Sequence, residues 1–180
     1  MKHKILTITG PSGVGKSVLA AYLQEEAGLV RCITCTNRTP RLGEKDGVDY
    51  FFLTDDEFEQ AVKNGEMVEY DYHYGFGYGI RQADIQAALS VGHVLLVLNW
   101  AGAKSVESLY QASSIFVAPL SLDQLEQRLV GRSGHGDRLQ FAQEDLAHQK
   151  AFKSVLINDD LAQAKADLLA WALQELGQKR

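Results

Sequence analysis

Residues 10–17 read GPSGVGKS and match the pattern G-x-x-x-x-G-K-[S/T] at every specified position. A short apolar run, residues 4–9, precedes this stretch, and a helical pattern that stops at Gly28 follows it. In a glycine-rich turn between a strand and a helix, backbone N–H groups converge on a phosphate and the helix dipole adds positive charge. An ordinary glycine-rich turn is the alternative, but the match of both motif and context favours a nucleoside triphosphate site. The predicted ATP-binding residues here are Gly10, Pro11, Ser12, Gly13, Val14, Gly15, Lys16 and Ser17.

The composition is typical of one globular domain. The chain has 180 residues, of which 46% are hydrophobic and 23% are charged. A net charge of -5 argues against a surface that coats nucleic acid, and no apolar run reaches the roughly 18 residues that cross a bilayer. The first residues are too quickly polar for a signal peptide, so we expect a cytoplasmic protein with no nucleic-acid or membrane partner.

The two cysteines, Cys32 and Cys35, stand in a segment rich in β-branched and apolar residues. In a strand, positions three apart point to opposite faces, so the two sulfurs would diverge. The sequence has no second cysteine pair, and its five histidines show no ligand spacing. Buried or half-buried thiols are therefore favoured over a redox or zinc site.

Strand and helix patterns alternate at both ends of the chain, which predicts an α/β fold with a doubly wound parallel sheet. Residues 29–35 are expected to form its second strand. Thr54 with Glu57, and Ser121 with Gln124, are expected to cap the starts of two helices. Residues 36–80 are richer in strands and are predicted to be a small insertion into a core made of residues 1–35 and 81–180. Aromatic residues occupy every even position from Tyr70 to Tyr78, an alternation that predicts one buried face of a strand or hairpin.

The loop formed by residues 37–50, NRTPRLGEKDGVDY, places Arg38 and Arg41 three apart and ends at Tyr50. A solvated turn would explain it, since Pro40 breaks a helix and charged loops are common. Two guanidiniums and a tyrosine hydroxyl also suit an oxyanion. A second anion site beside the glycine turn suits phosphoryl transfer, which needs mainly positioning and charge neutralisation.

Taken together, these motifs resemble the guanylate kinase family. The resemblance covers GPSGVGKS, T-x-x-x-R-T-P-R-x-G-E-x-x-G-x-D-Y at 34–50, G-E-M-V-E at 65–69, G-Y-G at 77–79, L-x-x-R-L-x-x-R at 125–132 and I-N-D-D-L at 157–161. It implies a P-loop NTPase-type fold with a monophosphate-binding insertion and a short lid at about 132–139. It also implies an ATP-dependent, Mg²⁺-assisted phosphorylation of a nucleoside monophosphate, with GMP converted to GDP.

The resemblance also assigns roles to individual residues. Glu69 corresponds to the carboxylate that reads the guanine edge, which suits the N–H donors of that edge. Asn99 stands at a second base-reading position, and Ser17 is the implied metal ligand. Residues matching the family's binders of the acceptor phosphate are Thr34, Arg38, Arg41, Tyr50 and Tyr78.

Arginines that resemble the lid and its flanks follow later in the chain. Arg132 and Arg138 would join Lys16, Arg38 and Arg41 as the catalytic set, and Arg128 belongs to the same group. Pairing of Arg128 with a nearby carboxylate on the helix surface is an alternative. Asn158 matches the turn that lies against the donor's adenine, although a helix N-cap explains it equally well.

Four features depart from the family pattern. Val97 and Asn99 replace two aspartates, Ile80 replaces a hydroxyl residue, and only five residues separate Arg132 from Arg138. Val97 offers no metal ligand, and an unpaired buried polar atom costs about 1 to 3 kcal/mol, so guanine preference is expected to be weakened. Two alternatives therefore stay open: another phosphorylated acceptor, such as a different monophosphate or a ribose bisphosphate-type sugar phosphate, and a noncatalytic nucleotide-binding module.

Overall fold

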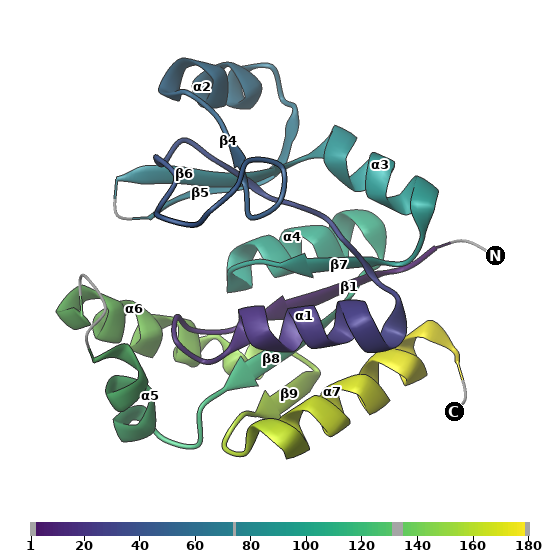
Figure 1. The fold of residues 1–180 in the computed structure, drawn as a ribbon, viewed down its shortest axis with the longest axis vertical. Helices are drawn as coiled ribbons and strands as arrows, with labels where there is room; N and C mark the ends of the chain where they lie inside the picture. The colour runs from purple at the N-terminus through teal and green to yellow at the C-terminus, as the bar shows by residue number, and fades with distance from the viewer. Residues whose placement is uncertain (1–2, 74, 131–134, 179–180) are drawn as a thin grey trace.

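The computed structural model describes residues 3–73, 75–130 and 135–178 (Figure 1). Among these residues, five parallel strands form the central sheet in the order β2-β7-β1-β8-β9. This confirms the predicted α/β class with a parallel sheet. The strands are β1 (Ile5–Thr9), β2 (Val30–Arg31), β7 (Val94–Val97), β8 (Ser113–Ala118) and β9 (Ser154–Ile157).

Helices cover both faces of the central sheet, which explains why its strands are almost continuously apolar. Along β1, Leu6 and Ile8 pack toward helices α1 (Lys16–Ala27) and α7 (Leu161–Leu176), whereas Ile5 joins the opposite cluster with residues of α3 (Gln82–Val91) and α4 (Trp100–Tyr110). In Figure 1, α5 (Leu122–Leu129) and α6 (His135–Ala147) lie together at one end of this layer.

A second sheet, in the order β4-β3-β6-β5, lies at the top of Figure 1 with α2 (Asp55–Lys63) above it. Its strands are β3 (Cys35–Thr36), β4 (Phe51–Phe52), β5 (Met67–His73) and β6 (Phe76–Arg81). All of them come from residues 35–81, between the second and third strands of the central sheet in chain order. The boundaries of 36–80 as an inserted unit stay a prediction.

Several local predictions are confirmed. Gly28 ends α1 in the left-handed conformation, and Thr54 caps α2 through a complete capping box with Glu57. Ser121 caps α5 by accepting from the backbone N–H of Gln124. Both cysteines are buried and free. None of the helices in the described part of the chain is long and apolar enough to span a membrane.

The expected strand over residues 29–35 is wrong, because the segment divides between the two sheets. Val30 and Arg31 pair with β7, whereas Cys35 pairs with β6 and β4. The apolar and β-branched pattern continues across the break, since both halves are covered by neighbouring elements. The sequence pattern therefore did not reveal where the chain leaves one sheet for the other.

The single buried aromatic face predicted for residues 70–78 is also wrong. These residues do form a hairpin, but Tyr70, Tyr72 and Phe76 are exposed. From Glu69 to the turn, each even-numbered residue of β5 pairs with an odd-numbered residue of β6, as Tyr72 does with Gly77, and each odd-numbered residue pairs with an even-numbered one, as Asp71 does with Tyr78. Directly paired residues share a face, so the even positions change faces at the turn.

Candidate functional site

A cleft of about 710 Å³ lies between the central sheet and the second sheet. The glycine turn after β1 and the first residues of α1 form one wall. The loop after β3, together with β5 and β6, forms another. The start of α4 and the C-terminal half of α6 complete the cleft. Crevices at the carboxyl ends of parallel strands, where the strand order changes direction, are the usual ligand sites of such sheets.

The glycine turn is tightly packed against its neighbours and lines the cleft. Gly10 and Gly15 have φ angles of 134° and 98°, and a Cβ on Gly10 would lie 2.1 Å from the carbonyl oxygen of Val117. Gly15 is the N-cap of α1 and provides no side-chain cap for the first helical N–H groups. These N–H groups and the helix dipole are therefore available to an anion.

Asn158 holds this turn from the other side. It is 4% exposed, and its Nδ2 donates to the carbonyl oxygen of Val14 at 2.8 Å. A Cβ on Gly15 would lie 2.6 Å from the same Nδ2. The alternative reading of Asn158 as a helix N-cap is wrong, because Asp160 caps α7.

Lys16 lies in the cleft and its Nζ donates to the carbonyl oxygens of Gly10 and Pro11 at 2.6 and 2.8 Å. Burial lowers the pKa of Lys16 to about 8, an effect that the nearby Asp145 carboxylate opposes. An anion beside the ammonium would restore a higher pKa, since opposite charge favours the charged form. The group is thus suited to a phosphate.

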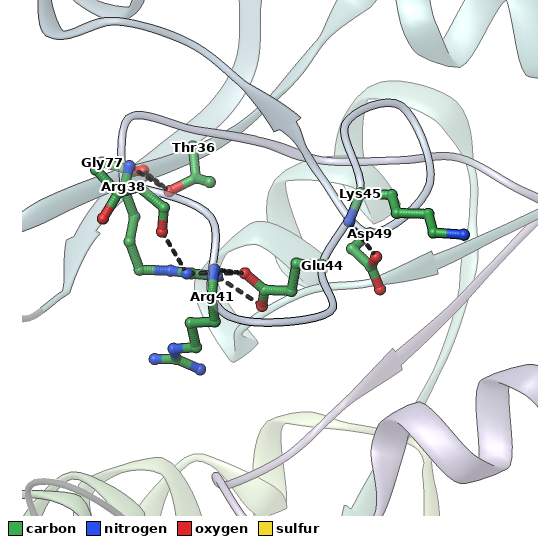
Figure 2. Close-up of polar contacts among 8 residues, drawn as sticks. Thr36, Arg38, Arg41, Glu44, Lys45, Asp49 and Gly77 are labelled. Carbon is green, nitrogen blue, oxygen red and sulfur yellow. Dashed lines mark hydrogen bonds and ion pairs between the residues drawn. The ribbon is translucent and has the colours of Figure 1, made fainter.

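Figure 2 shows that the two arginines of the 37–50 loop have different surroundings. The Arg38 guanidinium is buried and forms two hydrogen bonds of 2.9 Å with the Glu44 carboxylate. Glu44 also accepts from the backbone N–H of Arg41 at 2.7 Å. The Nε of Arg38 is buried and has no hydrogen-bond partner among the described residues.

The Arg41 side chain extends away from this ion pair in Figure 2 and lines the cleft. Its guanidinium makes no hydrogen bond within the described part of the chain. Thr34, Tyr50 and Tyr78 line the same cleft, and the two tyrosine rings contact edge to face with centroids 6.0 Å apart. Of the predicted acceptor-phosphate residues, only Arg38 lies behind the cleft surface.

Glu69 reaches the cleft from β5, and its carboxylate lies against Gly102 at the start of α4. A Cβ on Gly102 would be 2.6 Å from the Glu69 Oε2 atom, so the glycine makes room for the carboxylate. Burial, and secondarily the neighbouring Asp71, raises the pKa of Glu69 to about 7. Asn99 also lines the cleft and caps α4.

Ile80 and Val97, two of the residues that depart from the family pattern, lie in different surroundings. Ile80 is fully buried in the apolar cluster with Leu96 and Leu98, so its side chain belongs to the core. Val97 lines the cleft near the glycine turn. Within the described residues, no group of three or more His, Cys, Asp or Glu could hold a metal. The Ser17 hydroxyl, which lines the cleft, fits a Mg²⁺ that is bound mainly by phosphate oxygens.

The predicted lid arginines are placed only in part. Arg128 donates from Nη2 to the carbonyl oxygen of Asn158 at 3.0 Å, so it supports the turn that holds the glycine loop. Pairing of Arg128 with Glu126 is not among the contacts of the described residues, and the side chain of Asp137, the other carboxylate considered for it, lies outside them. Arg132 lies outside the described residues, and so does the side chain of Arg138, whose backbone belongs to α6.

Sequence reasoning missed several residues of the cleft. Trp100 and His148 stack with ring centroids 3.5 Å apart, and Phe141, Glu144 and Asp145 of α6 line the same wall. Asp71 lies beside Glu69 on β5. Trp100 and Asp71 stand next to predicted site positions, which was the available signal. The α6 residues depend on how a distant helix packs, and no local spacing indicates it.

Comparison with known proteins is consistent across sequence and structure. The family model for guanylate kinase matches residues 2–175. The chain is 34% identical over 173 residues to the guanylate kinase of Fusobacterium nucleatum subsp. nucleatum, covering 92% of this chain and 94% of that protein. It is 38% identical over 175 residues to the guanylate kinase of Corynebacterium diphtheriae, covering 92% of each. A crystal structure of guanylate kinase from Anaplasma phagocytophilum matches with a TM-score of 0.78 at 27% identity, covering 96% of this chain and 86% of that chain.

Proposed function

The chain belongs to the guanylate kinase family, and we propose that it transfers the γ-phosphoryl group of ATP to GMP, forming ADP and GDP. One observation carries the proposal: Lys16 of the glycine turn, Arg41 of the 37–50 loop and Glu69 all line the same cleft. A triphosphate and a monophosphate bound there would meet within one cleft, which supplies the positioning that phosphoryl transfer requires.

On the ATP side, backbone N–H groups of the glycine turn and of the first residues of α1 bind the β-phosphate. Lys16 turns from the carbonyl oxygens of Gly10 and Pro11 to the β- and γ-phosphate oxygens and neutralises charge as it develops. The Ser17 hydroxyl would help to hold a Mg²⁺ bound mainly by phosphate oxygens, and that ion would supply further charge neutralisation. Asn158 holds the glycine turn in place through its hydrogen bond to the carbonyl oxygen of Val14.

On the GMP side, the guanidinium N–H groups of Arg41 donate to the phosphate oxygens. Further hydroxyl donors come from Thr34, Tyr50 and Tyr78. Arg38, which lies behind the cleft surface, adds positive charge beside the phosphate, while Glu44 holds its guanidinium plane in position. Glu69 accepts hydrogen bonds from the guanine edge. The GMP phosphate oxygen is already anionic near neutral pH, so the reaction needs no strong general base.

Residues 36–80 act in this proposal as the acceptor-binding unit, and residues 132–139 act as a short lid. Arg132 and Arg138 of that lid neutralise the transferring phosphoryl group. Approach of the two sides would exclude water before transfer. The buried ion pair between Arg38 and Glu44 supports this division, because it stiffens the acceptor loop independently of the glycine turn.

A coupled assay for ADP release with ATP and a panel of monophosphates tests the function. We expect GMP to be the preferred acceptor, with AMP, CMP and UMP far slower. Lys16→Ala should lower kcat by about 10²–10³, as expected when one group that stabilises transition-state charge is lost. Lys63→Ala, on an exposed turn of α2, is the matched control and should leave kcat unchanged. Preference for another acceptor, or binding of both nucleotides without ADP release, would contradict the proposal.

A further inference from the structure

Asp71 lies in the base-binding part of the cleft and has no role in the reaction described above. It follows Glu69 by two residues on β5, so both side chains project from the same face of the strand. Asp71 pairs in register with Tyr78 of β6, which also lines the cleft. Two carboxylates therefore border the space next to Tyr78.

Asn99 holds the Asp71 carboxylate in one orientation. The Oδ1 of Asn99 accepts from the backbone N–H of Gly102 at 2.7 Å, as the N-cap of α4. Because that bond requires the oxygen, the other end of the amide must be Nδ2, and it donates to Oδ2 of Asp71 at 2.8 Å. The Oδ1 of Asp71 accepts from the backbone N–H of Tyr72 at 2.7 Å.

These bonds decide which side chain can accept from a ligand. The Oδ1 of Asn99 is committed to the start of α4, and its Nδ2 is a donor. Each oxygen of a carboxylate can accept more than one hydrogen bond, whereas the single acceptor of Asn99 is used by the backbone N–H of Gly102. Asp71, rather than Asn99, is therefore the second acceptor of this wall.

The guanine edge needs such an acceptor. Guanine donates one hydrogen from N1 and two from N2, whereas the two oxygens of Glu69 face N1–H and one N2–H. The remaining N2–H would be buried without a partner unless another acceptor lies beside Glu69. Asp71 occupies that position on the same face of β5.

We infer that Asp71 is a specificity-determining residue that accepts the second N2 hydrogen of guanine, and that Asn99 is a positioning residue that orients its carboxylate. This inference rests on the proposed function, because it deepens the recognition of GMP by the same cleft. Two adjacent carboxylates also disfavour bases that present an acceptor on this edge, such as adenine through N1.

Calorimetric binding of GMP and IMP tests the inference, because IMP lacks only the 2-amino group. Asp71→Asn and Asp71→Ala should each weaken GMP binding by about 10-fold or more, the value of a hydrogen bond to a charged group, while IMP affinity changes by less than about 2-fold. The ratio of the two affinities isolates the 2-amino contact from general damage to the cleft. Asp56→Asn on α2 is the matched control and should leave both affinities unchanged.

Asn99→Ser tests the positioning role, since serine keeps a capping oxygen for α4 but removes the amide donor to Asp71. The GMP to IMP affinity ratio should fall while the melting temperature stays close to that of the wild type. A GMP to IMP affinity ratio that stays unchanged in both Asp71 variants, including through an equal loss of both affinities, would overturn the role of Asp71. An unchanged ratio in Asn99→Ser would overturn the positioning role. Wild-type protein that binds neither nucleotide would overturn the proposed function and this inference together.

Discussion

At the scale of single residues, Arg38 and Arg41 show how neighbours in sequence take different physical tasks. Arg38 is 6% exposed and paired with Glu44, whereas Arg41 is exposed at the cleft. We expect Arg38→Ala to lower the free energy of unfolding by about 2 kcal/mol, because the half-buried Glu44 carboxylate loses two hydrogen bonds and keeps only that from the backbone N–H of Arg41. Arg41→Ala should change it by less than about 0.5 kcal/mol. Both variants should weaken GMP binding. Urea denaturation and calorimetry measure the two effects.

The double variant Arg38→Ala/Glu44→Gln is the control for that comparison. Removing the stranded carboxylate should recover part of the lost stability without restoring GMP affinity. Equal destabilisation by Arg38→Ala and Arg41→Ala would show that the difference in burial has no energetic consequence.

Glu69 gives the cleft a measurable pH dependence. Its pKa is raised from 4.5 to about 7, first by burial and then by Asp71. Between these pH values the folded protein binds more protons than the unfolded chain, so the contribution of Glu69 to stability is lost as pH rises through about 7. Glu69→Gln should therefore have a higher melting temperature than the wild type at pH 8, and the difference should vanish near pH 4. Thermal unfolding across this pH range measures the difference in melting temperature. A difference that does not change with pH would contradict the raised pKa of Glu69.

At the scale of elements, the turn after β9 supports the glycine turn after β1. We expect Asn158→Ala to weaken ATP binding by about 10-fold, since it removes a buried hydrogen bond to the Val14 carbonyl oxygen, while GMP binding stays unchanged. Calorimetry with each nucleotide separately measures the effect. Asn64→Ala, at the exposed end of α2, is the control. Equal loss of ATP and GMP affinity would mean that Asn158 supports the whole cleft.

Elements with local signals were predictable from the sequence, and elements defined by pairing partners were not. The capping box at Thr54 and the stop at Gly28 depend on residues a few positions apart, so their patterns are sufficient. The division of 29–35 between two sheets and the change of face in the 70–78 hairpin depend on which strands pair. A one-residue difference in register moves a side chain to the other face, and no local pattern fixes that register.

At the scale of the whole molecule, sequence motifs predicted part of the candidate site. They did not predict the residues that only tertiary packing brings into the cleft. The glycine turn, Arg41, Tyr78 and Glu69 all reach one cleft, as their motifs indicated. Trp100 and His148 come from segments far apart in the chain and stack only because α6 returns to the end of β7. The side-chain bond between Asn99 and Asp71 likewise joins two sheets, so neither residue predicts the other.

In the proposed reaction, the glycine turn and the 37–50 loop bind two phosphate groups that face each other within one cleft. Calorimetry with a bisubstrate ligand, adenosine and guanosine joined through a five-phosphate chain, tests it most directly. We predict one ligand per chain and a Kd at least about 10-fold below that of ATP or GMP alone, because linking the two halves raises their effective concentration. Lys16→Ala and Arg41→Ala should each remove most of this gain. A bisubstrate ligand that binds no more tightly than either nucleotide, or at two per chain, would contradict this arrangement of the two phosphate groups.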